Sequence, residues 1–262
     1  MDVIDLTPEH EALYFACLED WSDEVKEGLA RKAGWYAKMK PRGLRVKLAR
    51  DDDGRIGGMI QYLPIEHSMV DGAGLYFIPC VWVHGHAQGR GNFQKRGMGG
   101  ALLAAAEEDA RGLGAKGMAA WGLWLPFWMR ASWYKRHGYR TADRHGISVL
   151  VWKAFAADAA RPRWFEPNRK SLTPVPGKVN VTAFVNGWCT ATNVTCERAR
   201  RAALEFGDAV VFREVDTFER GAVAEWGESD GVYVDGKSVQ AGPPPSYEKV
   251  RSIIARRVRR LR

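Results

Sequence analysis

Several features that mark specialised classes of protein are absent from this sequence. Four cysteines in 262 residues are too few for the disulfide framework on which small secreted domains depend. No apolar stretch approaches the roughly 20 residues that a membrane-spanning helix needs. The first twenty residues carry six acidic side chains, whereas a signal peptide begins with basic ones. We therefore expect a cytoplasmic protein without a membrane anchor.

What is present favours a folded protein of one large domain or two ordinary ones. Hydrophobic residues make up 46% of the chain, which is enough to bury a sizeable core. The net charge of +8 is uneven, and much of it lies in residues 251–262. No aromatic residue alternates with these arginines, as a nucleic-acid stacking platform would require. We expect no nucleic-acid partner and instead an amphipathic terminal helix, docked through Val250, Ile253, Ile254, Val258 and Leu261.

A glycine-rich turn lies between an apolar, strand-like run and a helix. The run is Leu75 to Val83, the turn is Gln94 to Gly99, and the helix covers residues 98–111. In this arrangement, glycine lets the backbone approach a ligand, and the free N–H groups of the first helical turn point at an anion. The turn has neither the three glycines of a Rossmann fingerprint nor the G-K-[ST] of an ATP P-loop. We expect it to hold a pyrophosphate, with cofactor contacts from Val81, Trp82, Val83, Gln94, Lys95, Arg96, Gly97, Met98, Gly99 and Gly100.

The pattern Q-x-x-G-x-G, followed by a helix and a second strand-like run at residues 117–125, resembles the GNAT acyltransferase family. The segment from Trp133 to Tyr139 resembles that family's aromatic-Tyr-x-x-x-Gly-aromatic segment. The resemblance implies an α/β protein with the α+β GNAT fold and a mixed central sheet. It also implies acetyl-CoA as co-substrate, a small amine as acceptor, and Tyr134 as the acid that protonates the departing CoA thiolate.

Two segments depart from the family pattern. The connection from Val83 to Gln94 is longer than usual, and Pro126, Phe127 and Trp128 lie near the position where many relatives carry asparagine. We expect cofactor binding to be little affected by either change. The acceptor pocket should differ from that of a common family member, and Trp128 is a candidate to line it.

The order of expected elements in residues 1–157 also agrees with the start of the GNAT fold. A short strand, two helices and a hairpin precede the glycine-rich turn, at residues 3–6, 7–19, 22–38, 44–50 and 56–65. Pro79 falls inside the strand 75–83, and it cannot donate a ladder hydrogen bond. We expect a bulge or a splayed edge there, with an ordinary sheet edge as the alternative.

Three residues near strand ends are candidates for the general base. They are Glu66, His84 and His86, although each on its own fits an ordinary surface residue as well. A histidine near its usual pKa of about 6.5 would suit the task. His84, His86 and Cys80 also have metal-ligand chemistry, but the glycine between the histidines weakens that interpretation, and we expect no metal site.

Residues 158–177 are rich in proline and lack apolar periodicity, which predicts an interdomain linker. Residues 178–262 follow as strand, helix, strand, helix, hairpin and helix, and this order resembles a small thioredoxin-like domain with Trp188-Cys189 at the usual Trp-Cys position. The whole chain is similar to bacterial GNAT proteins with a YoaP-like C-terminal domain.

The second domain lacks the residues of a dithiol oxidoreductase. Thr192 replaces the second cysteine of C-x-x-C, and Ser229-Asp230 replaces the proline before the third strand. Cys189 could act as a single nucleophile or a soft-metal ligand, with Cys196 as a partner only if the loop folds back. The alternative is a domain in which Cys189 is partly buried and neither reacts nor binds a metal.

These patterns predict an acetyl-CoA-dependent N-acetyltransferase in which a small amine attacks the thioester directly. The alternative is a CoA-fold protein that transfers no acyl group and uses Cys189 to sense or bind thiols or soft metals. A homodimer is compatible with either function.

Overall fold

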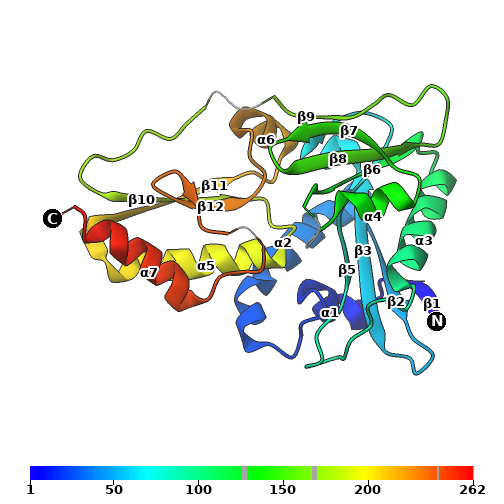
Figure 1. Ribbon diagram of the computed structural model, residues 1–262, viewed down its shortest axis with the longest axis horizontal. Coiled ribbons are helices and arrows are strands. Elements are labelled where there is room, and N and C mark those ends of the chain that lie inside the picture. Colours follow the sequence, from blue (N-terminus) through cyan, green and yellow to red (C-terminus); the bar gives the residue numbers. More distant parts are fainter. Residues whose placement is uncertain (126–128, 167–169, 241, 262) are drawn as a thin grey trace. The chain divides into compact units, whose positions relative to one another are not determined.

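The computed structural model describes residues 1–125, 129–166, 170–240 and 242–261. The chain divides into two compact units (Figure 1). Unit 1 comprises Met1–Ser22 and Tyr36–Phe165, and unit 2 comprises Asp23–Trp35 and Glu166–Arg262. These boundaries differ from the predicted domains 1–157 and 178–262 in two places. Unit 1 includes the first part of the predicted linker, and unit 2 includes a segment from near the N-terminus.

Unit 1 contains a seven-stranded sheet with the strand order β1-β2-β3-β5-β6-β8-β7. The strands are β1 (Asp2–Asp5), β2 (Arg45–Arg50), β3 (Ile56–Pro64), β5 (Tyr76–Val83), β6 (Gly117–Leu123), β7 (Arg140–His145) and β8 (Ser148–Ala154). Neighbouring strands are antiparallel except for β5 and β6, which run parallel. A parallel pair needs a crossover connection, and helix α3 (Met98–Gly112) supplies it. The predicted α/β class with a mixed central sheet is confirmed.

The two faces of this sheet are covered by different helices. Helix α3 and helix α4 (Ala131–Arg136) pack on one face, where Tyr134 joins a buried cluster with Tyr62 and Ile78. Helix α1 (Glu11–Phe15) reaches the other face, where Tyr14 donates a hydrogen bond to Gln61. Gln61 and Tyr62 are successive residues of β3, so their side chains point to opposite faces.

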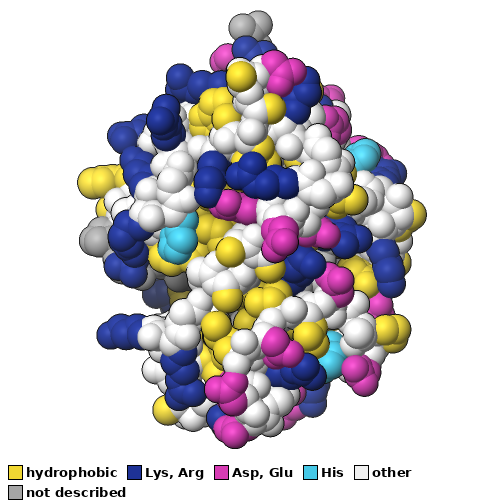
Figure 2. Space-filling view, turned by 90° about the vertical axis from the view of Figure 1, so that its right-hand side faces the viewer, with side chains coloured by type: hydrophobic (Ala, Val, Ile, Leu, Met, Phe, Trp, Pro, Cys, Tyr) yellow, Lys and Arg dark blue, Asp and Glu magenta, His cyan; other side chains and the backbone are white. Residues whose placement is uncertain are grey.

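Figure 2 shows a face of the molecule on which basic side chains are mixed with acidic ones.

A small second sheet explains why unit 1 extends to Phe165. Strand β4 (Val70–Asp71) pairs with β9 (Arg163–Trp164). The Trp164 N–H also donates to the Asp143 carboxylate at 2.9 Å, and Arg161 donates to the Ala142 carbonyl. These bonds fix a stretch that its proline content predicted to be a linker.

Unit 2 contains a four-stranded sheet with the order β11-β10-β12-β13. Strands β10 (Val179–Val185) and β11 (Val210–Asp216) are parallel, and β12 (Gly231–Val234) and β13 (Lys237–Ser238) continue the sheet antiparallel. The helices are α5 (Thr190–Glu205), α6 (Arg220–Trp226) and α7 (Tyr247–Val258). Val250 and Ile254 of α7 are buried in the core of this unit, which confirms the predicted docking of the basic helix, although Leu261 is 45% exposed.

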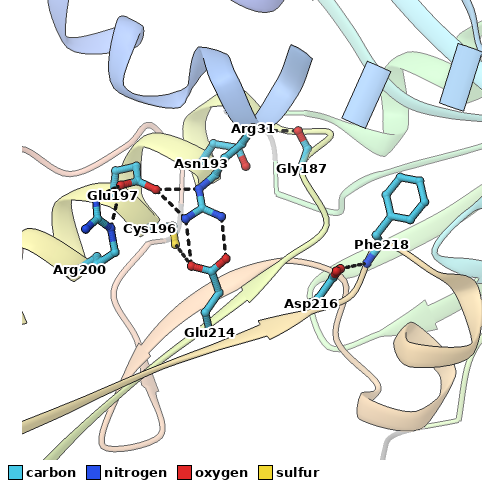
Figure 3. A network of polar contacts seen from close by, with 9 residues as sticks. All are labelled: Arg31, Gly187, Asn193, Cys196, Glu197, Arg200, Glu214, Asp216 and Phe218. Atoms are coloured by element: carbon cyan, nitrogen blue, oxygen red, sulfur yellow. Dashed lines mark hydrogen bonds and ion pairs between the residues drawn. The ribbon is translucent and has the colours of Figure 1, made fainter. Parts of the chain in front are cut away.

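The segment Asp23–Trp35 is held in unit 2 by ion pairs and close backbone packing (Figure 3). It contains a 3-10 helix (Asp23–Gly28) and the first part of helix α2 (Leu29–Met39). The Arg31 guanidinium donates to Glu197 at 2.7 Å and to both carboxylate oxygens of Glu214 at 2.7 and 2.9 Å. A Cβ at Gly28 would lie 3.0 Å from the Thr190 carbonyl oxygen, so a larger residue would push the segment away from α5.

We predict that Arg31→Ala lowers the free energy of unfolding of unit 2 by about 1–3 kcal/mol, because Glu214 loses its ion-pair partner and Glu197 keeps only Arg200. Hydrogen exchange of β10 and β11 should accelerate while exchange in β2 and β3 of unit 1 stays unchanged. Arg200→Ala is the matched control, since Arg200 also pairs with Glu197 but its side chain is 46% exposed, against 22% for Arg31. Equal effects of the two substitutions would contradict the assignment.

Candidate active site

Strands β5 and β6 separate in the middle of the unit 1 sheet. Their parallel ladder consists of three pairs and ends at Ile78 opposite Ala120, although both strands continue. On its other edge β5 carries a bulge, where Ile78 and Pro79 lie opposite the single residue Tyr62. The bulge and the splay predicted at Pro79 are therefore both present. The Trp121 indole N–H donates to the Pro79 carbonyl at 2.8 Å and satisfies that group within the gap.

The strand register shows which backbone groups of β5 face this gap. The His84 N–H donates to the Gly57 carbonyl at 2.9 Å, so these two residues form a hydrogen-bonded pair at the end of the antiparallel ladder with β3. Hydrogen-bonded and non-hydrogen-bonded pairs alternate along such a ladder. The N–H and C=O groups of Val81 and Val83 therefore point away from β3, toward the side that β6 has left. Residues 80–83 are each partly exposed, although β5 is a central strand.

The glycine-rich turn leads directly into helix α3 and leaves its first turn uncapped. Gly97 is the N-cap, with a φ of +87° that favours glycine, and no side chain caps the helix. Lys95 and Arg96 are exposed beside it, and Gln94 is fixed by a bond from its N–H to the Asn92 side chain at 2.9 Å. In a helix of this length, the N–H groups of the first turn form an anion site.

The start of α3 lies beside the gap between β5 and β6. A Cβ at Gly99 would be 3.3 Å from Cζ2 of Trp133 and 3.8 Å from Cγ2 of Val83. The first turn of α3, the end of β5 and helix α4 thus meet at one place. Of the predicted cofactor contacts, Val83, Gly97 and Gly99 are brought together here.

Tyr134 points its hydroxyl into the protein near Cys80. The residue is 2% exposed, and its Oη has no hydrogen-bond partner among the described residues. Burial raises the pKa of Tyr134 above its usual range, and the Cys80 thiol raises it further. Tyr134 is therefore a protonated donor, without a partner among the described residues, near the part of β5 that has separated from β6.

The predicted bases are engaged elsewhere. The Glu66 carboxylate accepts a hydrogen bond from the Gly74 N–H at 2.7 Å, in the turn before β5. His84 is fully buried: its Nδ1 donates to the Gly91 carbonyl at 2.7 Å and its Nε2 accepts from the Trp21 indole at 3.2 Å. His86 is exposed and lies 3.7 Å from the Glu19 carboxylate. Catalysis by these residues stays a prediction that the geometry does not support, and His84 instead fixes the long loop before the glycine-rich turn.

One prediction and one missed residue remain to be placed. Trp128, with Pro126 and Phe127, lies outside the described residues. Sequence reasoning missed Gln61, which is fully buried and lies opposite Cys80 in the ladder. A single polar residue inside the apolar strand Ile56–Pro64 was the signal that could have identified it.

Of three comparisons with known proteins, only the search of solved structures found similar ones. No family model matches the sequence, and a search of curated proteins returned no significant match. A GNAT family acetyltransferase from Brucella melitensis, solved with acetyl-CoA, is 20% identical with a TM-score of 0.42, over 61% of this chain and 91% of that one. A GNAT family N-acetyltransferase (YhbS) from Escherichia coli, solved with CoA, is 15% identical with a TM-score of 0.44, over 62% and 88%. The PaiA N-acetyltransferase from Thermoplasma acidophilum, also with CoA, is 15% identical with a TM-score of 0.43, over 59% and 100%.

Unit 2 places Cys189 at the N-cap of α5, where it is partly exposed. Trp188 donates its indole N–H to Asp230 at 2.6 Å, and the Thr192 side chain also bonds to this carboxylate. Thr192 and Asp230 are therefore within hydrogen-bond distance of each other. Cys196 is fully buried, and burial raises the pKa of its thiol to about 12. Cys189 and Cys196 are seven positions apart along the helix, which corresponds to about 10 Å and is beyond the reach of a disulfide.

Glu228 is a second acidic residue of unit 2, two positions before Asp230. Its carboxylate accepts a hydrogen bond from the Tyr233 hydroxyl at 2.6 Å. Burial and, to a smaller extent, the neighbouring Asp230 raise the pKa of Glu228 to about 7, although the bond from Tyr233 lowers it in part. The folded protein therefore holds a proton on Glu228 at pH values where the unfolded chain has lost it.

We predict that the free energy of unfolding of unit 2 falls as pH rises from about 4.5 to about 7, because the unfolded state binds fewer protons in this interval. The loss should be on the order of 3 kcal/mol and should be nearly complete above pH 7. Denaturant unfolding at several pH values measures it, and Glu228→Gln should remove this part of the pH dependence. Glu225→Gln, at an exposed acid of the same unit, is the control. An unchanged pH profile in Glu228→Gln would contradict the assignment.

Proposed function

We propose that this chain is an acetyl-CoA-dependent N-acetyltransferase that acts on a small amine. The observation that carries the proposal is the separation of β5 from β6 after Ile78, directly beside the uncapped start of α3. An unpaired edge of β5 that lies beside a helix start and near a phenol without a partner among the described residues fits a long thioester with a diphosphate at its other end.

Acetyl-CoA would lie along β5 in this proposal. Its pyrophosphate would accept hydrogen bonds from the first-turn N–H groups of Met98, Gly99 and Gly100, with Lys95 and Arg96 at the rim. The pantetheine amides would pair with the backbone of Val81 and Val83, in the place that a neighbouring strand normally fills. The thioester would then reach the level of Cys80 and Tyr134.

The reaction is attack of a neutral amine on the thioester carbonyl carbon. A C–N bond forms, the C–S bond breaks, the electron pair leaves with sulfur, and the amine nitrogen loses a proton to solvent, which returns one to Tyr134 after each turnover. Tyr134 donates a hydrogen bond to the departing thiolate and then its proton. Burial raises the pKa of the phenol, but the same desolvation raises the pKa of the thiol beside it, so the transfer stays feasible.

We predict that Tyr134→Phe lowers kcat by at least about tenfold and leaves the affinity for acetyl-CoA within about twofold, since the hydroxyl acts on the leaving group rather than on the bound cofactor. Release of free thiol from acetyl-CoA in the presence of an amine panel measures turnover, and calorimetry measures binding.

Tyr139→Phe is the matched control for this experiment. Tyr139 is 3% exposed, its ring centre is 5.4 Å from that of Tyr134, and it belongs to the same buried cluster. It should retain nearly full turnover. Equal losses in both variants would mean that packing explains the effect, and full turnover in Tyr134→Phe would remove the acid role.

We propose as a second function that unit 2 is a thioredoxin-like, YoaP-like module that binds thiols or soft metals through Cys189 alone. Its strand order and the N-cap position of Cys189 support this proposal. A thiol at a helix start is favoured in its ionised form by the helix dipole. The buried position of Cys196 argues against dithiol exchange.

We predict that iodoacetamide at pH 8 alkylates Cys189 in the native protein at least about tenfold faster than Cys196, whose thiol is buried and has a pKa near 12. Mass spectrometry of the labelled peptides measures both rates, and Cys189→Ser identifies the fast site. Equal rates, or a disulfide between the two residues after mild oxidation, would contradict the proposal.

A further inference from the structure

Gln61 carries a buried hydrogen-bond donor that nothing in the described chain uses. The residue is fully buried in the middle of β3, and its Nε2 has no partner among the described residues. Leaving such a donor unpaired is destabilising, so native proteins retain one where water or a ligand completes its hydrogen bond.

The orientation of the Gln61 side-chain amide is fixed by a hydrogen bond to its oxygen. The Tyr14 hydroxyl, on α1, donates to Gln61 Oε1 at 2.5 Å. This bond directs the Oε1 atom toward α1 and leaves the Nε2 group as the end that is presented elsewhere. It also polarises the amide, which makes its N–H groups better donors.

The strand register places this donor beside the point where β5 opens. Gln61 is directly opposite Cys80, so both side chains lie on the same face of the sheet, and Cys80 is partly exposed. Burial raises the pKa of both Tyr14 and Tyr134, and beyond burial the Cys80 thiol acts on each hydroxyl. Cys80 is therefore near both the phenol proposed for the leaving group and the pair formed by Tyr14 and Gln61.

We propose that Gln61 binds the acceptor substrate, and that its Nε2 group donates to an oxygen of an amine that carries a carbonyl, ether or hydroxyl group close to its nitrogen. Strand β5 separates Gln61 from the gap in which the thioester would lie, which favours an oxygen of the acceptor over the thioester carbonyl. This inference rests on the proposed acetyl transfer and names the class of amine that would accept the acetyl group.

The test uses pairs of primary amines of matched size, in which one member has an ether or amide oxygen where the other has a methylene group. The full-length protein should prefer the oxygen-bearing member at least about tenfold in kcat/KM. Gln61→Leu should reduce this preference below about threefold, mainly through KM, while the affinity for acetyl-CoA stays within about twofold. The double variant Tyr14→Phe/Gln61→Leu, which replaces both partners by apolar groups, should behave in the same way.

Tyr62→Phe is the matched control, because Tyr62 is equally buried on the same strand but bonds to Asp109 on the opposite face. It should keep the oxygen preference. A preference that survives in Gln61→Leu would overturn the proposal, and so would a loss of acetyl-CoA affinity in place of a change in KM, since that would place the amide on the thioester.

A measurement without turnover separates this proposal from the proposed function. The side-chain amide signal of Gln61 in a ¹⁵N NMR spectrum is the one missing in Gln61→Leu. With CoA present, it should shift when the oxygen-bearing amines are added and should stay in place with their methylene partners. A shift without acetyl transfer would keep the Gln61 assignment and reject the enzyme. Turnover without any shift would keep the enzyme and overturn the role of Gln61.

Discussion

The active-site proposal depends on a gap that opens next to a central strand. Pro79 cannot donate to a ladder, and the bulge at Ile78 and Pro79 turns the following residues of β5 away from β6. Backbone groups that a neighbouring strand would pair are thereby presented beside a helix start. The Trp121 indole satisfies the Pro79 carbonyl and so removes one cost of opening the sheet. In the proposed enzyme, the glycine-rich turn, the backbone of Val81 and Val83, and the Tyr134 hydroxyl work together because this gap connects them.

Unit 2 is built from two stretches of chain that are far apart in the sequence. Helix α2 contributes its first residues to unit 2 and its last residues to unit 1, so no single cut in the sequence separates the two units. The ion pairs of Arg31 with Glu197 and Glu214 connect residues more than 160 positions apart. Cys196 lies within this cluster and is buried by it, which leaves Cys189 as the cysteine of unit 2 that a reagent can reach.

Local chemistry was readable from the sequence, and side-chain partners were not. The proline in strand 75–83, the glycine at the start of α3 and the tyrosine of α4 lie on the elements that their patterns predicted. The roles of Glu66 and His84 depend on partners that no spacing reveals. Glu66 binds a backbone N–H in a turn, and His84 binds Trp21, which is 63 residues away. Strands β4 and β9 are two residues long, too short for any periodicity to show.

The most direct test of the central claim is a crystal structure of the protein with CoA. The account predicts that the pantetheine arm lies in the gap, with its amides hydrogen-bonded to the backbone of Val81 and Val83. It also predicts the pyrophosphate on the N–H groups of Met98, Gly99 and Gly100, and the sulfur within hydrogen-bond distance of Tyr134 Oη. CoA bound at another place, or a gap filled by side chains with the α3 start unoccupied at saturating CoA, would contradict it.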